Sequence, residues 1–458
     1  MGSLGPPVHR IYKLIRLPNL DRFGVKGETR DLNKNEVAKA VKRLLRSYGV
    51  ENWYFAERPD LFAVKGSASE TLKDYFVELP VKSILEWTGF EYIYKFGNGN
   101  QDKYGYGILK YPPYKCHRKN LQVKLLYETN QFLEKFIEII NHVKISENVH
   151  FNSQKLSKNL SEFFTSEHDL KIALISRTST DQQKVETLAR AKLSSYREGV
   201  SRLQIVNADK MLKINEDYYR HFLANLLAAL YFKSGCVPFY IQTPQKYDIL
   251  HNAFYIGVAL KRTSKGYVKG VATIMTGLGE IIAQVDTDKH NILRGNAMEF
   301  GDSEMKKFVE IIKEHMESYK HKLGIKPPLV VVIRTRRFKE NEWKALKSSF
   351  YPFWRRLIGE DAILLVMSLY KTKWSIGEGM ATFDGDDRSG VWLLQPQKVN
   401  YAVQLVYRST GYPPHLPVAA YLYLRALDFV SLTHGRINIP PVKYAYNYLR
   451  WRAIAEQW

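Results

Sequence analysis

Lys233 is a basic residue at the end of an amphipathic stretch, where an ammonium group could meet an anion. From Phe222 to Tyr231, apolar side chains recur at the three-to-four spacing of a buried helix face. Gly235 then acts as a helix stop, and a basic last turn suits the helix dipole. An apolar, β-rich run at residues 253–260 predicts an interior strand. The pattern indicates a junction between two α/β units with one lysine at the seam, although a solvated helix end is the simpler interpretation.

Other residues with chemical potential form no recognisable set. Cys116 and Cys236 lie far apart without metal-ligand spacing, which predicts reduced thiols, no zinc site and a cytoplasmic protein. The Gly-rich stretch at residues 97–107 lacks the Gly-Lys-Ser/Thr ending of a phosphate loop. No Ser/His/Asp or Cys/His arrangement stands out, and acids such as Glu280 are interpreted as solvated charges.

The net charge of +22, from 68 Lys and Arg against 46 Asp and Glu, indicates a polyanionic partner. Nucleic acid is the most frequent such partner, an anionic membrane surface is its next competitor, and some basic proteins have neither. No apolar run approaches the roughly 18 residues of a spanning helix, and the N-terminal residues lack a signal peptide's apolar core. The 45% of hydrophobic residues is ample for folded cores.

The order of predicted elements divides the chain into three parts. Residues 1–111, with a basic helix pattern at 33–46, are interpreted as an N-terminal accessory region. Residues 112–245 alternate strands and helices, which predicts a parallel sheet that binds ligands beyond the carboxyl ends of its strands. Residues 246–458 place a hairpin and a third strand before a long helix, the order of an RNase H-like core. Strands are expected at 121–126, 169–176, 202–206, 255–261, 266–275, 280–285, 328–334, 362–367, 390–394 and 402–406, and helices at 130–140, 181–197, 302–323, 418–432 and from 219 and 443.

Residues 112–458 resemble the MID and PIWI domains of Argonaute proteins. The stretch from Lys233 to Phe239 is similar to the family's Lys-x-Gly-Gly and Pro-aromatic junction, with Cys236 in place of the second Gly. Residues 432–446 are similar to the Leu-Thr, Pro-x-Val and Tyr-Ala pattern that precedes the family's final helix. The resemblance implies a Rossmann-like MID domain at 112–245 and an RNase H-like PIWI domain at 246–458. Because the chain has no room for a PAZ domain, it resembles a short prokaryotic Argonaute.

The resemblance implies a pocket for the 5′ end of a guide strand in the MID-like part. Lys192, Gln204 and Lys233 match the family's Lys–Gln–Lys set, and two ammonium groups with an amide can surround a terminal phosphate. The family's aromatic residue, which stacks on the first base, is replaced by Leu188. Two further cations are candidate contacts to the first base or to a phosphate: Arg190 and Arg202.

The resemblance also implies Mg²⁺ in this pocket, serving phosphate binding rather than catalysis. In several prokaryotic Argonautes the terminal carboxylate ligates the Mg²⁺ that bridges the guide phosphate, and such a hard cation needs oxygen ligands. The final helix stops on Trp458 without a polar tail. We therefore expect the Trp458 carboxylate and the Gln204 amide oxygen as Mg²⁺ ligands. A Trp458 that only packs is the alternative.

The PIWI-like part departs from the family at its catalytic carboxylates. An RNase H-type nuclease needs several carboxylates to hold two Mg²⁺ ions around the scissile phosphate. Ala259 occupies the position of the first Asp and Thr335 that of the second, and the last ligand position falls near His434 or Arg436. The resemblance therefore implies an inactive PIWI domain and no catalytic residues.

Two functions of different classes follow. The first is a catalytically inactive short Argonaute that binds a 5′-phosphorylated guide, RNA favoured, and pairs it with a complementary target, DNA favoured. Such a protein would work with a partner that replaces the missing N and PAZ parts, and with an effector in defence against invading nucleic acid. The alternative is a metal-dependent guided endonuclease with displaced carboxylates. A generic basic nucleic-acid binder would show no preference for a 5′-phosphate.

Overall fold

The computed structural model of the chain divides into two compact units. The first comprises Met1–Phe90, Met367–Ala419 and Gly435–Ile437, and the second comprises Glu91–Val366, Ala420–His434 and Asn438–Trp458. The boundaries expected at residues 111 and 245 fall inside the second unit and stay predictions. In the part of the chain that the structure describes, no helix is long and apolar enough to cross a membrane. The structure describes residues 12–16, 53–55, 61–65, 77–78, 81–83, 92–117, 120–143, 149–156, 170–176, 182–197, 200–262, 268–294, 297–323, 328–335, 338–371, 380–382, 390–394, 401–408, 416–429 and 439–456.

The first unit contains short antiparallel strand pairings. Four strands follow the order β2-β3-β1-β4, β21 pairs with β5, and β22 pairs with β23. The strands expected at 390–394 and 402–406 are confirmed as β22 and β23, whereas the helix expected at 33–46 lies outside the described residues. The bounds are β1 (Tyr12–Arg16), β2 (Trp53–Phe55), β3 (Leu61–Lys65), β4 (Val77–Glu78), β5 (Val81–Ser83), β21 (Met380–Thr382), β22 (Gly390–Leu394) and β23 (Tyr401–Arg408).

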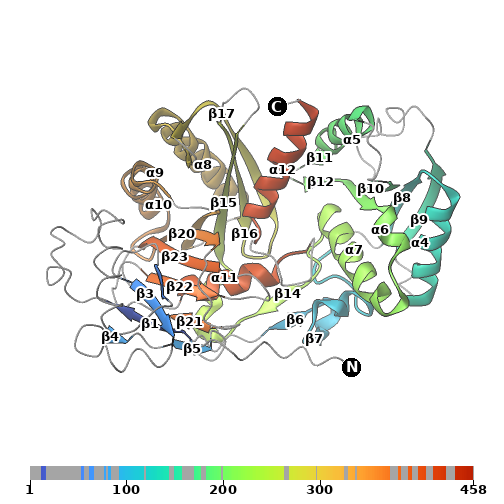
Figure 1. Ribbon diagram of the computed structural model, residues 1–458, viewed down its shortest axis with the longest axis horizontal. Coiled ribbons are helices and arrows are strands. Elements are labelled where there is room, and N and C mark those ends of the chain that lie inside the picture. Colours follow the sequence, from blue (N-terminus) through green and yellow to red (C-terminus); the bar gives the residue numbers. More distant parts are fainter. Residues whose placement is uncertain are drawn as a thin grey trace. The chain divides into compact units, whose positions relative to one another are not determined.

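A four-stranded sheet, called here the parallel sheet, lies in the second unit (Figure 1), which also contains a small sheet of β14 (Tyr240–Gln242), β6 (Ile93–Lys95) and β7 (Gln101–Asp102). The order of the parallel sheet is β13-β10-β8-β9 and every pairing is parallel, which confirms the prediction. All six residues of β10 are buried, as in interior strands with helices on both faces. Strand β9 was missed because most of its residues are polar and exposed. The bounds are β8 (Leu121–Tyr127), α4 (Asn130–Val143), β9 (Val149–Lys155), β10 (Leu170–Ile175), α5 (Gln182–Ser194), β13 (Leu203–Asn207), α6 (Ala208–Leu212) and α7 (Tyr219–Lys233).

A second sheet, called here the mixed sheet, runs in the order β18-β17-β16-β15-β19-β20 through the second unit. β15 pairs antiparallel with β16, which confirms the predicted hairpin, and it pairs parallel with β19, the buried strand expected at 328–334. Helices α9 and α10 were not predicted, because their sequence mixes aromatic and charged residues without a long apolar period. The bounds are β15 (Ala253–Arg262), β16 (Val268–Thr276), β17 (Ile281–Arg294), β18 (Ala297–Glu299), α8 (Asp302–Leu323), β19 (Leu329–Thr335), α9 (Glu340–Ala345), α10 (Tyr351–Ile358), β20 (Ile363–Lys371), α11 (Leu416–Ala426) and α12 (Val442–Ala455).

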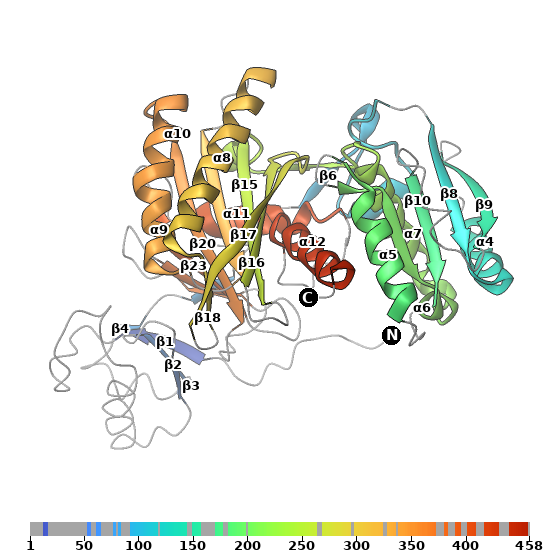
Figure 2. The same ribbon diagram turned by 90° about the horizontal axis from the view of Figure 1, so that it is seen from above.

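Helices cover both faces of the mixed sheet. Phe254 of β15 contacts Trp354 of α10, with ring centroids 5.9 Å apart, whereas Gly257 lies against the start of α12. Because successive side chains point to opposite faces of a strand, these helices lie on opposite sides, as Figure 2 shows. A Cβ atom on Gly257 would lie 2.2 Å from the backbone nitrogen of Val442, so only glycine permits this approach.

Helix α12 lies between the parallel sheet and the mixed sheet, against α5 on one side and against β15 and β16 on the other (Figures 1 and 2). Trp451 packs on an apolar cluster of the parallel sheet and α5 that includes Leu188 and Leu203. On the other side, Ala445 and Leu449 pack on β15 and β16. The last helix of the chain is therefore the element that joins the two halves of this unit.

The two cysteines are bonded, which corrects the expectation of reduced thiols. Cys116 and Cys236 form a disulfide with their Cα atoms 4.5 Å apart. The adjacent residues Lys115 and Val237 form a β-bridge, which brings together segments that are 120 residues apart along the chain. Sequence separation misled the prediction because it carries no information about distance in the fold.

Candidate anion-binding site

A pocket of about 190 Å³ lies at the seam between the parallel sheet and α12. Its walls come from α5, β13 and α7 on one side and from β17 and α12 on the other. Three cationic side chains and no carboxylate are among the described residues that line it. The charged and amide-bearing lining residues are Lys192, Gln204, Lys233, Gln284, Asn447 and Arg450.

Lys192 and Lys233 bring their ammonium groups to the same backbone oxygen. Lys192 Nζ donates to the carbonyl oxygen of Leu203, and Lys233 Nζ lies 3.5 Å from that oxygen and donates to Ser201 O at 2.6 Å. Both side chains are buried, with exposed fractions of 7% and 8%. Two like charges are therefore held together away from solvent.

Burial lowers the pKa of Lys233 to about 8. A buried ammonium group loses hydration that backbone carbonyls only partly replace. An anion in the pocket would favour the charged form of both lysines. The electrostatics of the pocket therefore suit a ligand with more than one negative charge.

The pocket lies at the amino end of β13, which corrects the expectation of a site at the carboxyl ends of the strands. Leu203 begins β13, Lys233 ends α7, and Lys192 lies in the last turn of α5. A helix C-terminus carries partial negative charge and repels anions. The cationic side chains of the pocket must therefore supply the attraction that a helix N-terminus gives in other α/β sites.

Helix α12 is held in place by ion pairs on both sides of the pocket. Lys443, near its start, binds both carboxylate oxygens of Asp428 at 2.7 and 2.6 Å, and both residues are buried. Near its end, Arg452 pairs with Asp286 of β17, and Glu456 binds Lys269 of β16 at 3.0 Å. These contacts fix the pocket-lining face of the helix against the mixed sheet.

Three of the predicted site residues, Lys192, Gln204 and Lys233, line this one pocket. Arg190 is exposed on α5 and Arg202 is half-buried beside β13, and neither lines it. Leu188, at the position of the family's aromatic residue, is part of the apolar core. Trp458 lies outside the described residues, so its part in the site stays a prediction.

Sequence reasoning missed the residues that α12 and β17 contribute. Tyr444, Asn447 and Trp451 recur at the spacing of one helix face and all line the pocket, with Arg450 beside them. That spacing, with an amide and a cation on an otherwise apolar face, was the available signal. Gln284 carried no such signal in the sequence, because a single polar residue within a β-strand is common.

The described lining residues do not by themselves form a Mg²⁺ site. A hard divalent cation takes several oxygen ligands, usually including carboxylates. The described wall offers amide and hydroxyl oxygens beside three cations. The expected Mg²⁺ site includes Trp458, which lies outside the described residues, and it stays a prediction.

Ala259 and Thr335, the positions compared with catalytic carboxylates, lie on neighbouring parallel strands. Val258 of β15 pairs with Arg334 of β19, so the next residue on each strand lies at the same edge. Ala259 is 3% exposed and packs against Ala445 of α12. His434 and Arg436 lie outside the described residues.

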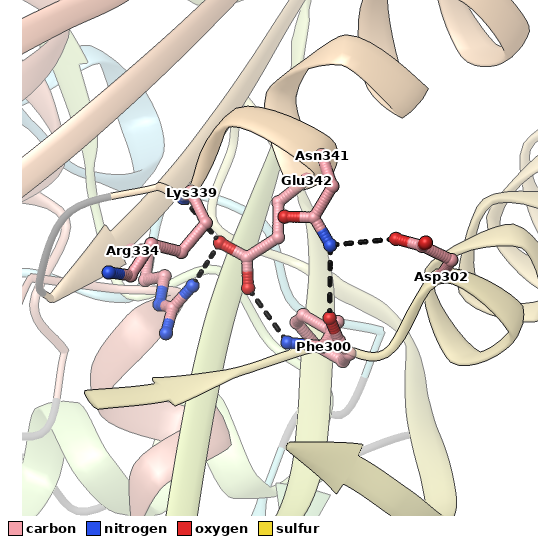
Figure 3. A network of polar contacts seen from close by, with 6 residues as sticks. All are labelled: Phe300, Asp302, Arg334, Lys339, Asn341 and Glu342. Carbon is pink, nitrogen blue, oxygen red and sulfur yellow. Dashed lines mark hydrogen bonds and ion pairs between the residues drawn. The ribbon is translucent and has the colours of Figure 1, made fainter. Parts of the chain in front are cut away.

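A buried carboxylate, Glu342, lies close to this edge and is fully engaged (Figure 3). It pairs with Arg334 and accepts hydrogen bonds from the backbone nitrogens of Lys339 at 2.7 Å and Phe300 at 2.9 Å. Asn341 extends the network by donating to Asp302 at 2.9 Å. Among the described residues, no group of three or more His, Cys, Asp and Glu side chains could hold a metal ion.

The parallel and mixed sheets, joined by the final helix around a basic pocket, define the Argonaute MID–PIWI type of α/β fold. The structure of Marinitoga piezophila Argonaute in complex with 5′ OH guide RNA and target DNA is similar, with a TM-score of 0.57 and 14% identity. It covers 92% of this chain, which spans 63% of that protein. A structure of that Argonaute with 5′ OH guide RNA has a TM-score of 0.55 and 14% identity, and the match covers 90% of this chain and 63% of that one. The A. aeolicus Argonaute structure has a TM-score of 0.54 and 14% identity, and the match covers 98% of this chain and 72% of that one. No family model and no curated protein matches the sequence.

Proposed function

We propose that this chain binds a nucleic-acid strand by its 5′-phosphate and pairs that strand with a complementary target. The observation that carries the proposal is the burial of Lys192 and Lys233 around one carbonyl oxygen in a pocket whose described lining has no carboxylate. A terminal phosphate carries about two negative charges at neutral pH, more than an internal phosphodiester. Such a ligand matches the surplus of cations that the pocket holds.

The remaining features of the chain support a nucleic acid as the body of this ligand. A net charge of +22 favours a long polyanion over a small phosphate ester. The similar Marinitoga piezophila structures contain 5′ OH guide RNA, and one also contains target DNA, so they support a guide strand but not its terminal phosphate. We therefore propose an RNA guide and a DNA target for this chain.

We propose that the chain acts as a binder and cuts no strand. Ala259 places a methyl group in apolar contacts, and Glu342 already neutralises Arg334. A two-metal nuclease needs free carboxylates at this edge. Target cleavage, or a defence response, would then be the task of a partner protein that recognises the loaded complex.

Substitution of the pocket lysines tests the proposal. Lys233→Met and Lys192→Met should each weaken binding of a 5′-phosphorylated strand by about 1–3 kcal/mol, the value of a charge-assisted bond. Binding of the same strand with a 5′-hydroxyl should change much less. Lys210→Met is the matched control, because Lys210 is exposed on α6 and does not line the pocket. Equal losses of affinity for both strands would mean that these lysines contact the sugar–phosphate backbone and not the terminal phosphate. That result would overturn the proposal.

A further inference from the structure

Two neutral polar groups are buried at the pocket without a partner. The hydroxyl of Tyr444 and the amide nitrogen of Gln284 have no hydrogen-bond partner among the described residues. Both residues line the pocket that Lys192 and Lys233 share. Buried polar groups are nearly always paired in native proteins, so each unpaired one calls for a ligand or another explanation.

Tyr444 is held rigidly in the first turn of α12. Its ring stacks on Phe232, with centroids 5.3 Å apart and planes 23° apart, and its exposed fraction is 7%. Phe232 directly precedes Lys233, so the stack couples the hydroxyl to the helix end that carries the ammonium group. Burial raises the pKa of Tyr444 well above its usual value, and the Asp428 charge adds to this effect. The hydroxyl is therefore a permanent donor.

Gln284 is held by the strand pairing of the mixed sheet. It lies opposite Thr273 on β16, and Asp286, two residues further along the same face, pairs with Arg452 of α12. Strand β17 and helix α12 are thereby fixed to each other where both border the pocket. The two donors come from the mixed sheet and its helix, whereas the two lysines come from α5 and α7.

We propose that Tyr444 Oη and Gln284 Nε2 donate hydrogen bonds to the terminal phosphate and make the pocket select phosphorylated ends partly through neutral donors. This rests on the proposed function, since the ligand is the same 5′-phosphate. Cationic contacts release counterions and weaken steeply with salt, whereas a neutral donor releases none. Part of the selection for a phosphorylated end therefore persists at high salt, and the phosphate bridges the two halves of the unit.

Tyr444→Phe tests the proposal because it removes one oxygen and keeps the ring that stacks on Phe232. The measurement is the Kd of one strand with a 5′-phosphate and with a 5′-hydroxyl, from about 50 to 200 mM salt. We expect the preference for the phosphorylated strand to fall about tenfold at every salt concentration, with an unchanged salt slope. Lys233→Met should instead lower the slope by about one. Gln284→Leu should behave like Tyr444→Phe.

One matched control lies on the same helix as Tyr444, and the other is an exposed glutamine that does not line the pocket. Tyr446→Phe changes a tyrosine of α12 that is 42% exposed and does not line the pocket, so it should leave the preference unchanged. Gln242→Leu replaces an exposed glutamine and should also leave the preference for the phosphorylated strand unchanged. Thermal unfolding of the free protein gives a second readout. Loss of an unpaired buried hydroxyl should raise the Tm of Tyr444→Phe, whereas loss of a structural hydrogen bond would lower it.

The possible results distinguish a failure of this assignment from a failure of the proposed function. If the wild-type protein binds both strands equally, both proposals fall. If the wild-type protein prefers the phosphorylated strand and both Tyr444→Phe and Gln284→Leu keep that preference, this assignment alone is overturned. A Tyr444→Phe variant with a lowered Tm and equal weakening on both strands would also overturn it, because the hydroxyl would then serve the fold.

Discussion

Lys192 and Lys233 come from different helices, yet both ammonium groups approach the carbonyl oxygen of Leu203. One backbone oxygen cannot neutralise two cations, so the free pocket keeps an excess of positive charge. This arrangement destabilises the free protein and is relieved by an anion. Binding and stability should consequently change in opposite directions when either lysine is replaced.

The lowered pKa of Lys233 predicts a pH-dependent stability. Because the pKa is about 8 in the folded chain against 10.5 ordinarily, the unfolded chain binds one more proton between these values. The free energy of unfolding should therefore rise with pH across this window, by on the order of 3 kcal/mol from this group. Urea unfolding at several pH values should show this rise in the wild type, and Lys233→Met should lack it. If the difference in the free energy of unfolding between wild type and Lys233→Met does not vary with pH, the lowered pKa of Lys233 is contradicted.

The same pKa predicts how binding responds to pH. A phosphate favours the charged ammonium group, so binding above about pH 8 requires uptake of a proton. The affinity for a 5′-phosphorylated strand should fall by up to tenfold per pH unit above that value. The 5′-hydroxyl strand should show a much weaker dependence, and equal dependence for both strands would contradict the prediction.

Glu342 is expected to be essential for stability. Glu342→Leu leaves Arg334 as a buried, unpaired charge and removes the acceptor for two backbone nitrogens. The expected loss is about 3–5 kcal/mol in the free energy of unfolding, measured with denaturant. Glu310→Leu, at an exposed position of α8, is the control and should change stability little. A loss below about 1 kcal/mol for Glu342→Leu would show that the network is dispensable.

Restoring acids at the predicted catalytic positions should not create a nuclease. Ala259→Asp places a carboxylate against Ala445 and Leu449 in a site that is 3% exposed, so it should destabilise the chain by several kcal/mol. Ala259→Asp with Thr335→Asp should show no guide-dependent cleavage with Mg²⁺ or Mn²⁺. Cleavage by the unmodified protein under these conditions would instead support the alternative of a guided endonuclease with displaced carboxylates.

The disulfide predicts a dependence of stability on redox conditions. The bond between Cys116 and Cys236 closes a loop that contains the whole parallel sheet. Cys116→Ser should lower the free energy of unfolding by about 2–4 kcal/mol under oxidising conditions. Reductant should lower the Tm of the wild type towards that of the variant and leave the variant unchanged. A wild-type Tm that is insensitive to reductant would contradict this prediction.

Much of the fold was readable from the sequence because its central strands are long apolar runs. The runs that became β10, β15 and β19 are unambiguous, and their order with intervening helices predicts both sheets. The edge strand β9 was missed because an exposed edge needs no apolar pattern. Proximity of distant segments was equally invisible, as the pairing of Cys116 with Cys236 shows.

Only part of the pocket could be predicted from the sequence. Lys192, Gln204 and Lys233 lie within one α/β unit, and the resemblance to the Argonaute Lys–Gln–Lys set singled them out. Tyr444 and Gln284 enter the pocket only because α12 packs between the sheets, and that depends on the close approach at Gly257. Such tertiary contacts leave no local mark in the sequence.

The most direct measurement compares one oligonucleotide before and after enzymatic removal of its 5′-phosphate, bound by the wild-type protein at fixed pH and salt. The strand is identical apart from the terminal group, so any change in Kd belongs to the phosphate. We predict that its removal weakens binding by at least about tenfold, the value of one charge-assisted contact. An unchanged Kd would contradict the account, because the cations of the pocket would then have no terminal phosphate to bind.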